Sequence, residues 1–459
     1  MMSCYLQKDL NLTGNKPHQP HITSIRNVRG LLVTMKIVNG LTSKKQVNLD
    51  RNTSIFSEKF LNLIESEEIS EPLSMYIHIP FCPSRDLSCD HETSVTHDPG
   101  RIDRYLDFLE IELDLVSQRS GKCVIGDLHV GGGTPNYLSD TQLVRLITMV
   151  EIRFDISVAE LSLDACPTRV SRSQLELLNG LGFTRIQFDV RELDPAVQSA
   201  IGRSHSFPML KDVFDSAREV GFELVCLDLN YGLPGQTVEG IRETVNQFKA
   251  LSPDRVELLP WSRRPDTYEH QRGIDESEIP SIADKVAMLS VAVDGLEDSG
   301  YTWVGLDCFT KKTDVIAEAQ RQGKLFRNWN GYTDKQQNLH LGFGVSAVSD
   351  LGVLRVRNHK SLIDWEAAVS QGCLPIQLGI SVSPEEVLER NAIMSLVCNM
   401  KLADNGYYKL PDESPALEAL ATQGVVEKIG GQLKITPQGR LQLNQLWGDS
   451  APQYRWGGF

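Results

Sequence analysis

The stretch YIHIPFCPSRDLSC, residues 76–89, decides how this chain folds. Residues 75–79 form a short alternating run with β-branched side chains, which predicts a buried strand. Pro80 ends that strand, because proline has no backbone N–H to donate to a sheet. The loop that follows carries Cys82 and Cys89. Cysteines on a loop at the end of a strand are one way to build a metal or iron–sulfur site, and two thiols near a surface turn are the alternative.

Beyond this stretch, predicted strands alternate with predicted helices. The strands are residues 75–79, 127–130, 159–164, 185–190, 224–230 and 255–259, and the helices are residues 102–117, 139–154, 171–181, 207–220 and 238–251. Such alternation predicts right-handed crossovers and a parallel sheet, and six units rather than eight indicate a partial barrel. The loops after the strands form the active face of a parallel barrel. We therefore expect the cysteine loop and the GGGTP loop, residues 131–135, to lie together.

The composition excludes several classes of protein. With 41% hydrophobic and 23% charged residues among 459, the chain is predicted to be globular, with two or three domains. Its net charge of -14 argues against a general nucleic-acid binder, which needs a basic face. No apolar run reaches the roughly 18 residues of a membrane span, and we expect no secretory signal. The nine cysteines are scattered, which favours a reducing cytoplasm over a disulfide framework.

Four segments are expected along the chain. Residues 1–54, in which Asn, Thr, Gly and Pro are frequent and periodicity is weak, are predicted to be a poorly ordered arm. Residues 55–290 would form the barrel, and residues 291–383, with aromatic strand-like stretches such as GYTWVGLDCF, would extend it. Residues 384–459 would form a small, mainly helical C-terminal domain with a hairpin that turns at the glycine pair 430–431.

The sequence HIPFC, followed by spaced cysteines and then GGGTP, resembles the radical S-adenosylmethionine (SAM) enzymes. Among these it is most similar to the oxygen-independent coproporphyrinogen III oxidases, over roughly residues 70–450. The resemblance implies an α/β fold: a partial parallel (β/α)6 radical SAM barrel with extra β elements that cover the substrate, and a small, mainly helical C-terminal domain. In that family, two propionate groups of coproporphyrinogen III lose hydrogen and carbon dioxide and become the vinyl groups of protoporphyrinogen IX.

The resemblance also implies the cofactors and partners. These are a 4Fe–4S cluster, one or two molecules of SAM, a porphyrinogen substrate and an external electron donor. The protein would be a cytoplasmic monomer with neither nucleic acid nor membrane as a partner.

The site residues implied by the resemblance follow the family's motifs. The family's cluster motif is CxxxCxxC. Here Cys82 and Cys89 match its first and third positions, Asp86 occupies the second, and all three are predicted metal ligands. The predicted cofactor-binding residues are Tyr76, Ser88, Gly132, Gly133, Thr134, Asp164, Arg191, Arg203, Asp228, Ser262 and Val348.

Several positions depart from the family pattern. Besides Asp86, the chain has Asp164 for a glutamate, Cys166 for an aspartate, Arg191 for a glutamine, Ser88 for a frequent aromatic residue, His91 for a further cysteine and Cys308 for a histidine. Such changes at one face, with the scaffold motifs intact, indicate relaxed constraint on catalysis.

Asp86 separates the main hypotheses. In the first, the protein is a working oxidase, and the Asp86 carboxylate binds iron as a harder and weaker ligand than a thiolate, which raises the potential of the cluster. In the alternative, Asp86 is a loop residue, the cluster is lost, and the protein is a catalytically silent relative. Such a relative would bind a partner protein, or a tetrapyrrole whose propionates pair with Arg191, Arg203, Arg263 and Arg264.

The related haem-chaperone branch is a third possibility, because it shares HIPFC and GGGTP. The stretch FRNWNGYT, residues 326–333, and the long C-terminal part are more similar to the oxidase branch.

Overall fold

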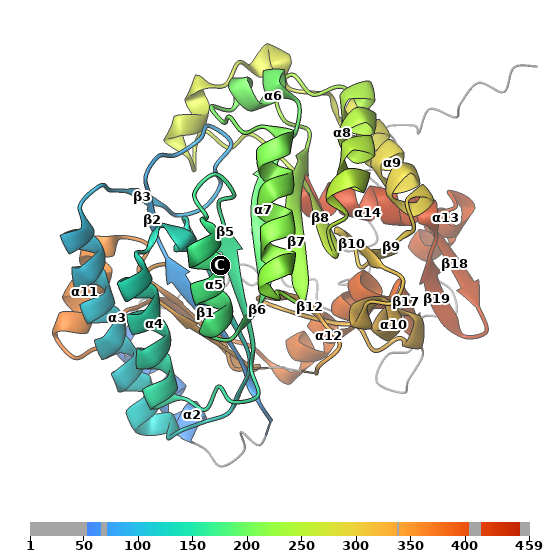
Figure 1. Ribbon diagram of the computed structural model, residues 1–459. Helices are drawn as coiled ribbons and strands as arrows, with labels where there is room; N and C mark the ends of the chain where they lie inside the picture. Colours follow the sequence, from blue (N-terminus) through green and yellow to red (C-terminus); the bar gives the residue numbers. More distant parts are fainter. Residues whose placement is uncertain (1–52, 66–70, 337–338, 404–414, 450–459) are drawn as a thin grey trace, which may run out of the picture.

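A computed structural model describes residues 53–65, 71–336, 339–403 and 415–449 (Figure 1). The arm predicted at residues 1–54 lies outside the described residues, except for its last two, which begin helix α2 (Thr53–Glu65). The division into four segments remains a prediction.

The centre of the fold is a run of parallel strands. They are β1 (Leu73–Ile79), β4 (Ile125–Gly132), β5 (Glu160–Ala165), β6 (Phe183–Arg191), β7 (Leu224–Tyr231) and β8 (Arg255–Pro260), paired in this order. All six predicted strands are therefore confirmed. A seventh, β13 (His340–Phe343), pairs in parallel with the other edge of β1. Short strands β2 (Phe81–Cys82) and β3 (Ser94–Val95) pair beside the carboxyl end of β1.

The predicted helices connect these strands and lie along their outer side (Figure 1). They are α3 (Pro99–Ser120), α4 (Asp140–Arg153), α5 (Arg172–Gly180), α7 (Phe207–Val220) and α8 (Val238–Leu251), with the short α6 (Pro195–Ala200) before α7.

Helix α7 shows why the sequence folds this way. Ser206 accepts a hydrogen bond from the Met209 N–H and so caps the first turn, and Gly221 ends the helix in a left-handed conformation. Leu210, Phe214 and Ala217 have helical spacing and are buried against the sheet.

Antiparallel strands extend the sheet at both edges. On the β13 side they are β14 (Val348–Asp350), β15 (Leu354–Asn358) and β16 (Ile376–Ser381), and on the β8 side β10 (Cys308–Lys311) and β9 (Tyr301–Val304). The hairpin β11 (Phe326–Asn328) and β12 (Gly331–Thr333) stands apart from that sheet. The helices here are α9 (Ile282–Asp298), α10 (Val315–Gln322) and α11 (Leu362–Ser370), and the 3-10 turns are η1 (Pro135–Tyr137), η2 (Glu269–Gly273) and η3 (Glu276–Glu278).

The C-terminal part combines helices with a small sheet. Its elements are α12 (Pro384–Asn399), β17 (Lys401–Ala403), α13 (Pro415–Thr422), β18 (Val426–Ile429), β19 (Gln432–Ile435) and α14 (Pro437–Asp449). The expected hairpin is present, and Gly430 and Gly431 both have positive φ, as a tight two-residue turn requires. Arg440 of α14 joins this part to the barrel, because its Nε donates to the Gly305 carbonyl oxygen at 2.7 Å.

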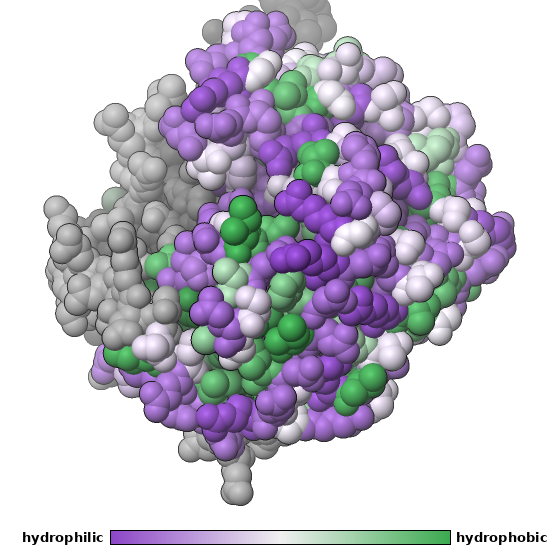
Figure 2. Space-filling view, turned by 90° about the vertical axis from the view of Figure 1, so that its left-hand side faces the viewer, coloured by the Kyte–Doolittle hydropathy of each residue, from purple (hydrophilic) through white to green (hydrophobic). Residues whose placement is uncertain are grey.

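The surface has an ordinary mixture of polar and apolar residues. On the face seen in Figure 2, hydrophilic residues surround small groups of hydrophobic ones. Exposed apolar side chains belong to several elements, for example Ile111 on α3, Ile152 on α4 and Ile363 on α11. Among the described residues, the structure contains no helix that combines the length and the apolar character of a membrane span.

Candidate active site

The predicted site residues gather around one cavity at the carboxyl ends of the parallel strands. The cavity has a volume of about 340 Å³, which lies in the range of small-molecule sites. Its lining includes ten of the predicted residues: Cys82, Asp86, Cys89, Gly132, Gly133, Thr134, Asp164, Arg191, Arg203 and Asp228. The expectation that the loops after the strands meet at one face is therefore confirmed.

The GGGTP loop and the cysteine loop are bonded to each other. The Gly133 N–H donates to the Ile79 carbonyl oxygen at 2.8 Å, and the Thr134 N–H donates to the Phe81 carbonyl oxygen at 2.9 Å. A Cβ atom on Gly133 would lie 2.7 Å from the carbonyl oxygens of Pro80 and Phe81. We expected these glycines to admit a ligand, and in the structure Gly133 admits the backbone of the neighbouring loop.

Side chains from the η2 region hold the cysteine loop from the other side. The Trp261 Nε1–H donates to the Ser88 carbonyl oxygen at 3.0 Å, and Gln271 Nε2 donates to the Cys89 carbonyl oxygen at 3.1 Å. A ring nitrogen of His270 lies 2.8 Å from the same Cys89 oxygen. Sequence reasoning missed these three supports, because they come from a loop more than 170 positions further along the chain.

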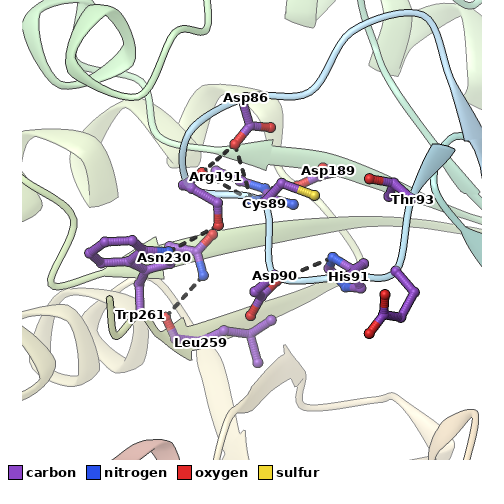
Figure 3. A network of polar contacts seen from close by, with 12 residues as sticks. Asp86, Cys89, Asp90, His91, Thr93, Asp189, Arg191, Asn230, Leu259 and Trp261 are labelled. Atoms are coloured by element: carbon purple, nitrogen blue, oxygen red, sulfur yellow. Dashed lines mark hydrogen bonds and ion pairs between the residues drawn. The ribbon is translucent and has the colours of Figure 1, made fainter. Parts of the chain in front are cut away.

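Asp86 is bonded to protein groups on both carboxylate oxygens. Figure 3 shows it beside Arg191. The Ser88 hydroxyl donates to Oδ1 at 2.6 Å, and Arg203 Nε donates to Oδ2 at 3.0 Å. Arg191 Nη1 lies 3.5 Å from Oδ1. Burial opposes the charge of Asp86, but Arg191 and Arg203 outweigh it and lower the pKa of this carboxyl to about 2.

Arg191 and Arg203 also share a second carboxylate, Asp189. Arg191 Nε donates to Asp189 Oδ1 at 2.8 Å, and Arg203 Nη2 donates to Asp189 Oδ2 at 2.6 Å. Burial disfavours the charged form of Asp189, but the two guanidinium groups hold its pKa well below its usual range. Asp86, Asp189, Arg191 and Arg203 thus form a charge-balanced ring, which we call the four-charge cluster.

Arg191 has an unusual backbone conformation. Its φ is 66°, in the left-handed region, and the pairing of β6 with β7 is irregular between Asp189 and Arg191. Such irregularities redirect side chains and are frequent next to active sites. Asp189 was missed in the sequence, although its position two residues before Arg191 on a strand was a usable signal.

The two thiols near Asp86 are buried. Cys82 and Cys89 are 4% and 7% exposed, and both are free cysteines. Burial alone would raise the pKa of the Cys89 thiol, but the neighbouring His91 and Arg191 lower it. Asp90 Oδ1 lies 3.2 Å from His91 Nδ1.

Polar side chains continue below the cavity into the barrel. The rings of Tyr76 and His129 stack at 5.9 Å, and His129 Nε2 lies 3.2 Å from Asp164 Oδ1. Asp228 accepts a hydrogen bond from Gln187. Burial, and then the neighbouring Glu257, raise the pKa of Asp228 well above its usual range.

The remaining predicted residues lie outside the cavity lining. They are Tyr76, which lies in the barrel beneath Gly131, Ser88, which supports Asp86, Ser262, which follows β8, and Val348, which begins β14. Of the other departures, Cys166 lines the cavity and Cys308 is buried in β10 opposite Glu257.

The arginines expected to bind propionates already have carboxylate partners. Besides the two in the four-charge cluster, Arg263 pairs with Glu276, and Arg264 Nη2 lies 3.3 Å from Asp90 Oδ2. Arg85 and Arg169 also line the cavity, are exposed, and have no carboxylate partner within the described ranges. Sequence reasoning did not single out either of them.

As the structure places them, Cys82, Asp86 and Cys89 are not arranged to bind an iron–sulfur cluster as its three protein ligands. Across the described parts of the chain, no three His, Cys, Asp or Glu side chains are placed to hold one metal ion. Asp86 is instead bonded to Ser88 and Arg203, and it lies close to Arg191. By contrast, a polar cavity bounded by the GGGTP loop, Asp164 and Asp228 fits a SAM-sized molecule in volume and in hydrogen-bonding groups.

Comparison with known proteins identifies relatives along most of the chain. Residues 76–248 match the family model described as the radical SAM superfamily. The oxygen-independent coproporphyrinogen III oxidase of Synechocystis is 32% identical, over 82% of this chain and 84% of its own length. The protein of that name from Escherichia coli K12 is also 32% identical over 82% of this chain and 84% of its own length.

A solved structure agrees with these matches. Coproporphyrinogen III oxidase from Escherichia coli, described as a radical SAM enzyme, superimposes with a TM-score of 0.79 and 31% identity, covering 89% of this chain and 97% of that one. The predicted fold class is therefore confirmed, and the relatives' names favour the oxidase branch over the haem-chaperone branch. The chain belongs to the oxygen-independent coproporphyrinogen III oxidase family of radical SAM proteins.

Proposed function

We propose that this protein acts on coproporphyrinogen III with SAM, as a radical SAM oxidase of its family that yields protoporphyrinogen IX. The observation that supports this most is the single cavity at which ten site positions of the family meet, in a chain that matches the named oxidases over more than four fifths of its length. Family membership supports SAM and a 4Fe–4S cluster as the cofactors, whereas the protein contacts of Asp86 leave the cluster without its third ligand in this arrangement.

The chain's own residues have distinct parts in this proposal. The GGGTP loop, Asp164 and Asp228 bind SAM, for which they offer polar groups in the lining of the cavity. Asp228 is held in place there by a hydrogen bond that it accepts from Gln187.

Arg85 and Arg169 at the rim bind the propionates of the substrate. A guanidinium group forms paired hydrogen bonds with a carboxylate, and these two arginines are not already paired with one inside the described ranges. Arg169 also lies over the Tyr137 ring at 5.3 Å, a contact that holds its side chain near the cavity.

A second candidate function is binding of a tetrapyrrole without turnover. The contacts of Asp86 favour it, because a carboxylate bonded to Ser88, Arg191 and Arg203 is not available to a metal. In either function the protein is proposed to be a cytoplasmic monomer, and turnover further requires an external electron donor.

One experiment separates the two functions. The protein is reconstituted with iron and sulfide without oxygen, supplied with dithionite, SAM and coproporphyrinogen III, and assayed for 5′-deoxyadenosine and protoporphyrinogen IX. Formation of both products supports the oxidase. Coproporphyrinogen binding in the micromolar range with neither product supports the binding protein, and absence of both binding and product contradicts the whole proposal.

A further inference from the structure

We infer that Asp86 is a structural anchor rather than an iron ligand, and that it holds the cysteine loop in place in the metal-free protein. The parts of the chain involved are the loop formed by residues 82–93 and the end of β6.

Three of the departures from the family pattern are bonded to one another. The Ser88 hydroxyl donates to Asp86 Oδ1 at 2.6 Å, and Arg191 Nη1 donates to the same Ser88 oxygen at 3.0 Å. Arg191 Nη1 also lies 3.5 Å from Asp86 Oδ1. Ser88 and Arg191 are 103 positions apart, so this closed set of contacts joins two distant parts of the chain. Independent drift at three unrelated sites would not be expected to yield mutual partners.

The four-charge cluster extends this set into the wall of the cavity. Each arginine contacts both carboxylates, and the side chains of Asp86, Arg191 and Arg203 are 12%, 7% and 17% exposed. If one carboxylate is removed from such a site, the two buried guanidinium groups share a single negative charge, which is unfavourable. If Asp86 turned toward iron, it would lose its contacts with Ser88, Arg191 and Arg203. The two buried arginines would then have only Asp189 to balance their charge.

Other contacts support the same loop without a metal. Figure 3 shows Trp261 and Arg191 close to the loop segment that carries Asp86 and Cys89. The Trp261 Nε1–H and Gln271 Nε2 bind the carbonyl oxygens of Ser88 and Cys89. The loop is thus held through the side chains at positions 86 and 88 and through the backbone at positions 88 and 89. These contacts would hold the loop in the metal-free protein as well.

The consequence is a site with two thiols and no third ligand. Asp86→Cys alone restores the thiol but leaves Arg191 facing it, whereas the double change Asp86→Cys with Arg191→Gln removes the cation as well. Iron and acid-labile sulfide per chain are measured after reconstitution in the wild type and in these two variants. We expect fewer than two irons in the wild type, an intermediate value in the single variant and close to four in the double variant.

Stability gives a second readout that needs no iron. Treatment of the wild type with a chelator should leave its melting temperature unchanged, and Asp86→Ala should lower that temperature in chelator. Glu219→Ala, which removes an exposed ion pair with Arg172, is the matched control and should have little effect.

The result that overturns the inference is four irons per wild-type chain, lost in Asp86→Ala. An unaltered melting temperature in Asp86→Ala would overturn it equally. Failure of the proposed function would be a different result. In that case the protein would not bind coproporphyrinogen, whether or not it contained iron.

Discussion

Replacing Asp86 by alanine should destabilise the metal-free protein by about 3 kcal/mol. Removal of one partner from a buried ion pair costs about 3–5 kcal/mol. The lower end applies here, because the Asp86 side chain is 12% exposed and Asp189 remains to compensate both arginines. Unfolding entropies of about 2.1 cal/mol/K per residue give roughly 1 kcal/mol/K for a chain of 459 residues, so the melting temperature should fall by about 3 °C.

A double-mutant cycle with Arg191→Ala makes the prediction specific. Because Asp86 and Arg191 are in contact, the double variant should be less destabilised than the two single variants together, by about 1–2 kcal/mol. Calorimetry in the presence of a chelator measures all four proteins, with Glu219→Ala as the exposed control. Strict additivity, or an effect of Asp86→Ala no larger than that of the control, would refute the assignment of Asp86 as an anchor.

Three further predictions concern other parts of the site. Arg169→Ala should weaken coproporphyrin III binding, measured by fluorescence, about tenfold, whereas Arg172→Ala on the outer helix α5 should not. Gly133→Ala should abolish SAM binding in calorimetric titration and lower the melting temperature, because its Cβ would meet two carbonyl oxygens at 2.7 Å. Burial lowers the pKa of His78 from 6.5 to about 4, so the neutral ring stabilises the fold above pH 6.5. That contribution, up to about 3 kcal/mol, is lost as the pH falls from 6.5 to 4, and His78→Gln should flatten the acid limb of the stability profile.

The parallel core could be predicted because its signals are local. Each strand is a short apolar run, each helix has an apolar stripe, and caps such as Ser206 and Gly221 define the ends. The helices at Phe207–Val220 and Val238–Leu251 match their predicted bounds. The antiparallel strands β14, β15 and β16 were not individually predicted, because a strand at the edge of a sheet owes its pairing to partners far along the chain.

The positions of the site could be predicted better than their contacts. The loops after parallel strands converge by topology, which brought Cys82, Asp86 and Thr134 to one cavity. The contacts of Asp86 could not be predicted, because Arg191 and Arg203 follow it by more than 100 residues and no periodicity relates these positions. The prediction of Asp86 as a metal ligand considered the loop alone and therefore could not include these cations.

Amide hydrogen exchange across residues 82–91 tests the central claim most directly. The wild-type protein is compared after chelator treatment and after reconstitution with iron and sulfide. If ion pairs hold the loop, protection should be the same in both samples, and it should fall at least tenfold in Asp86→Ala. Protection that arises only after iron is supplied would contradict the account, because it would mean that the metal orders the loop and the carboxylate does not.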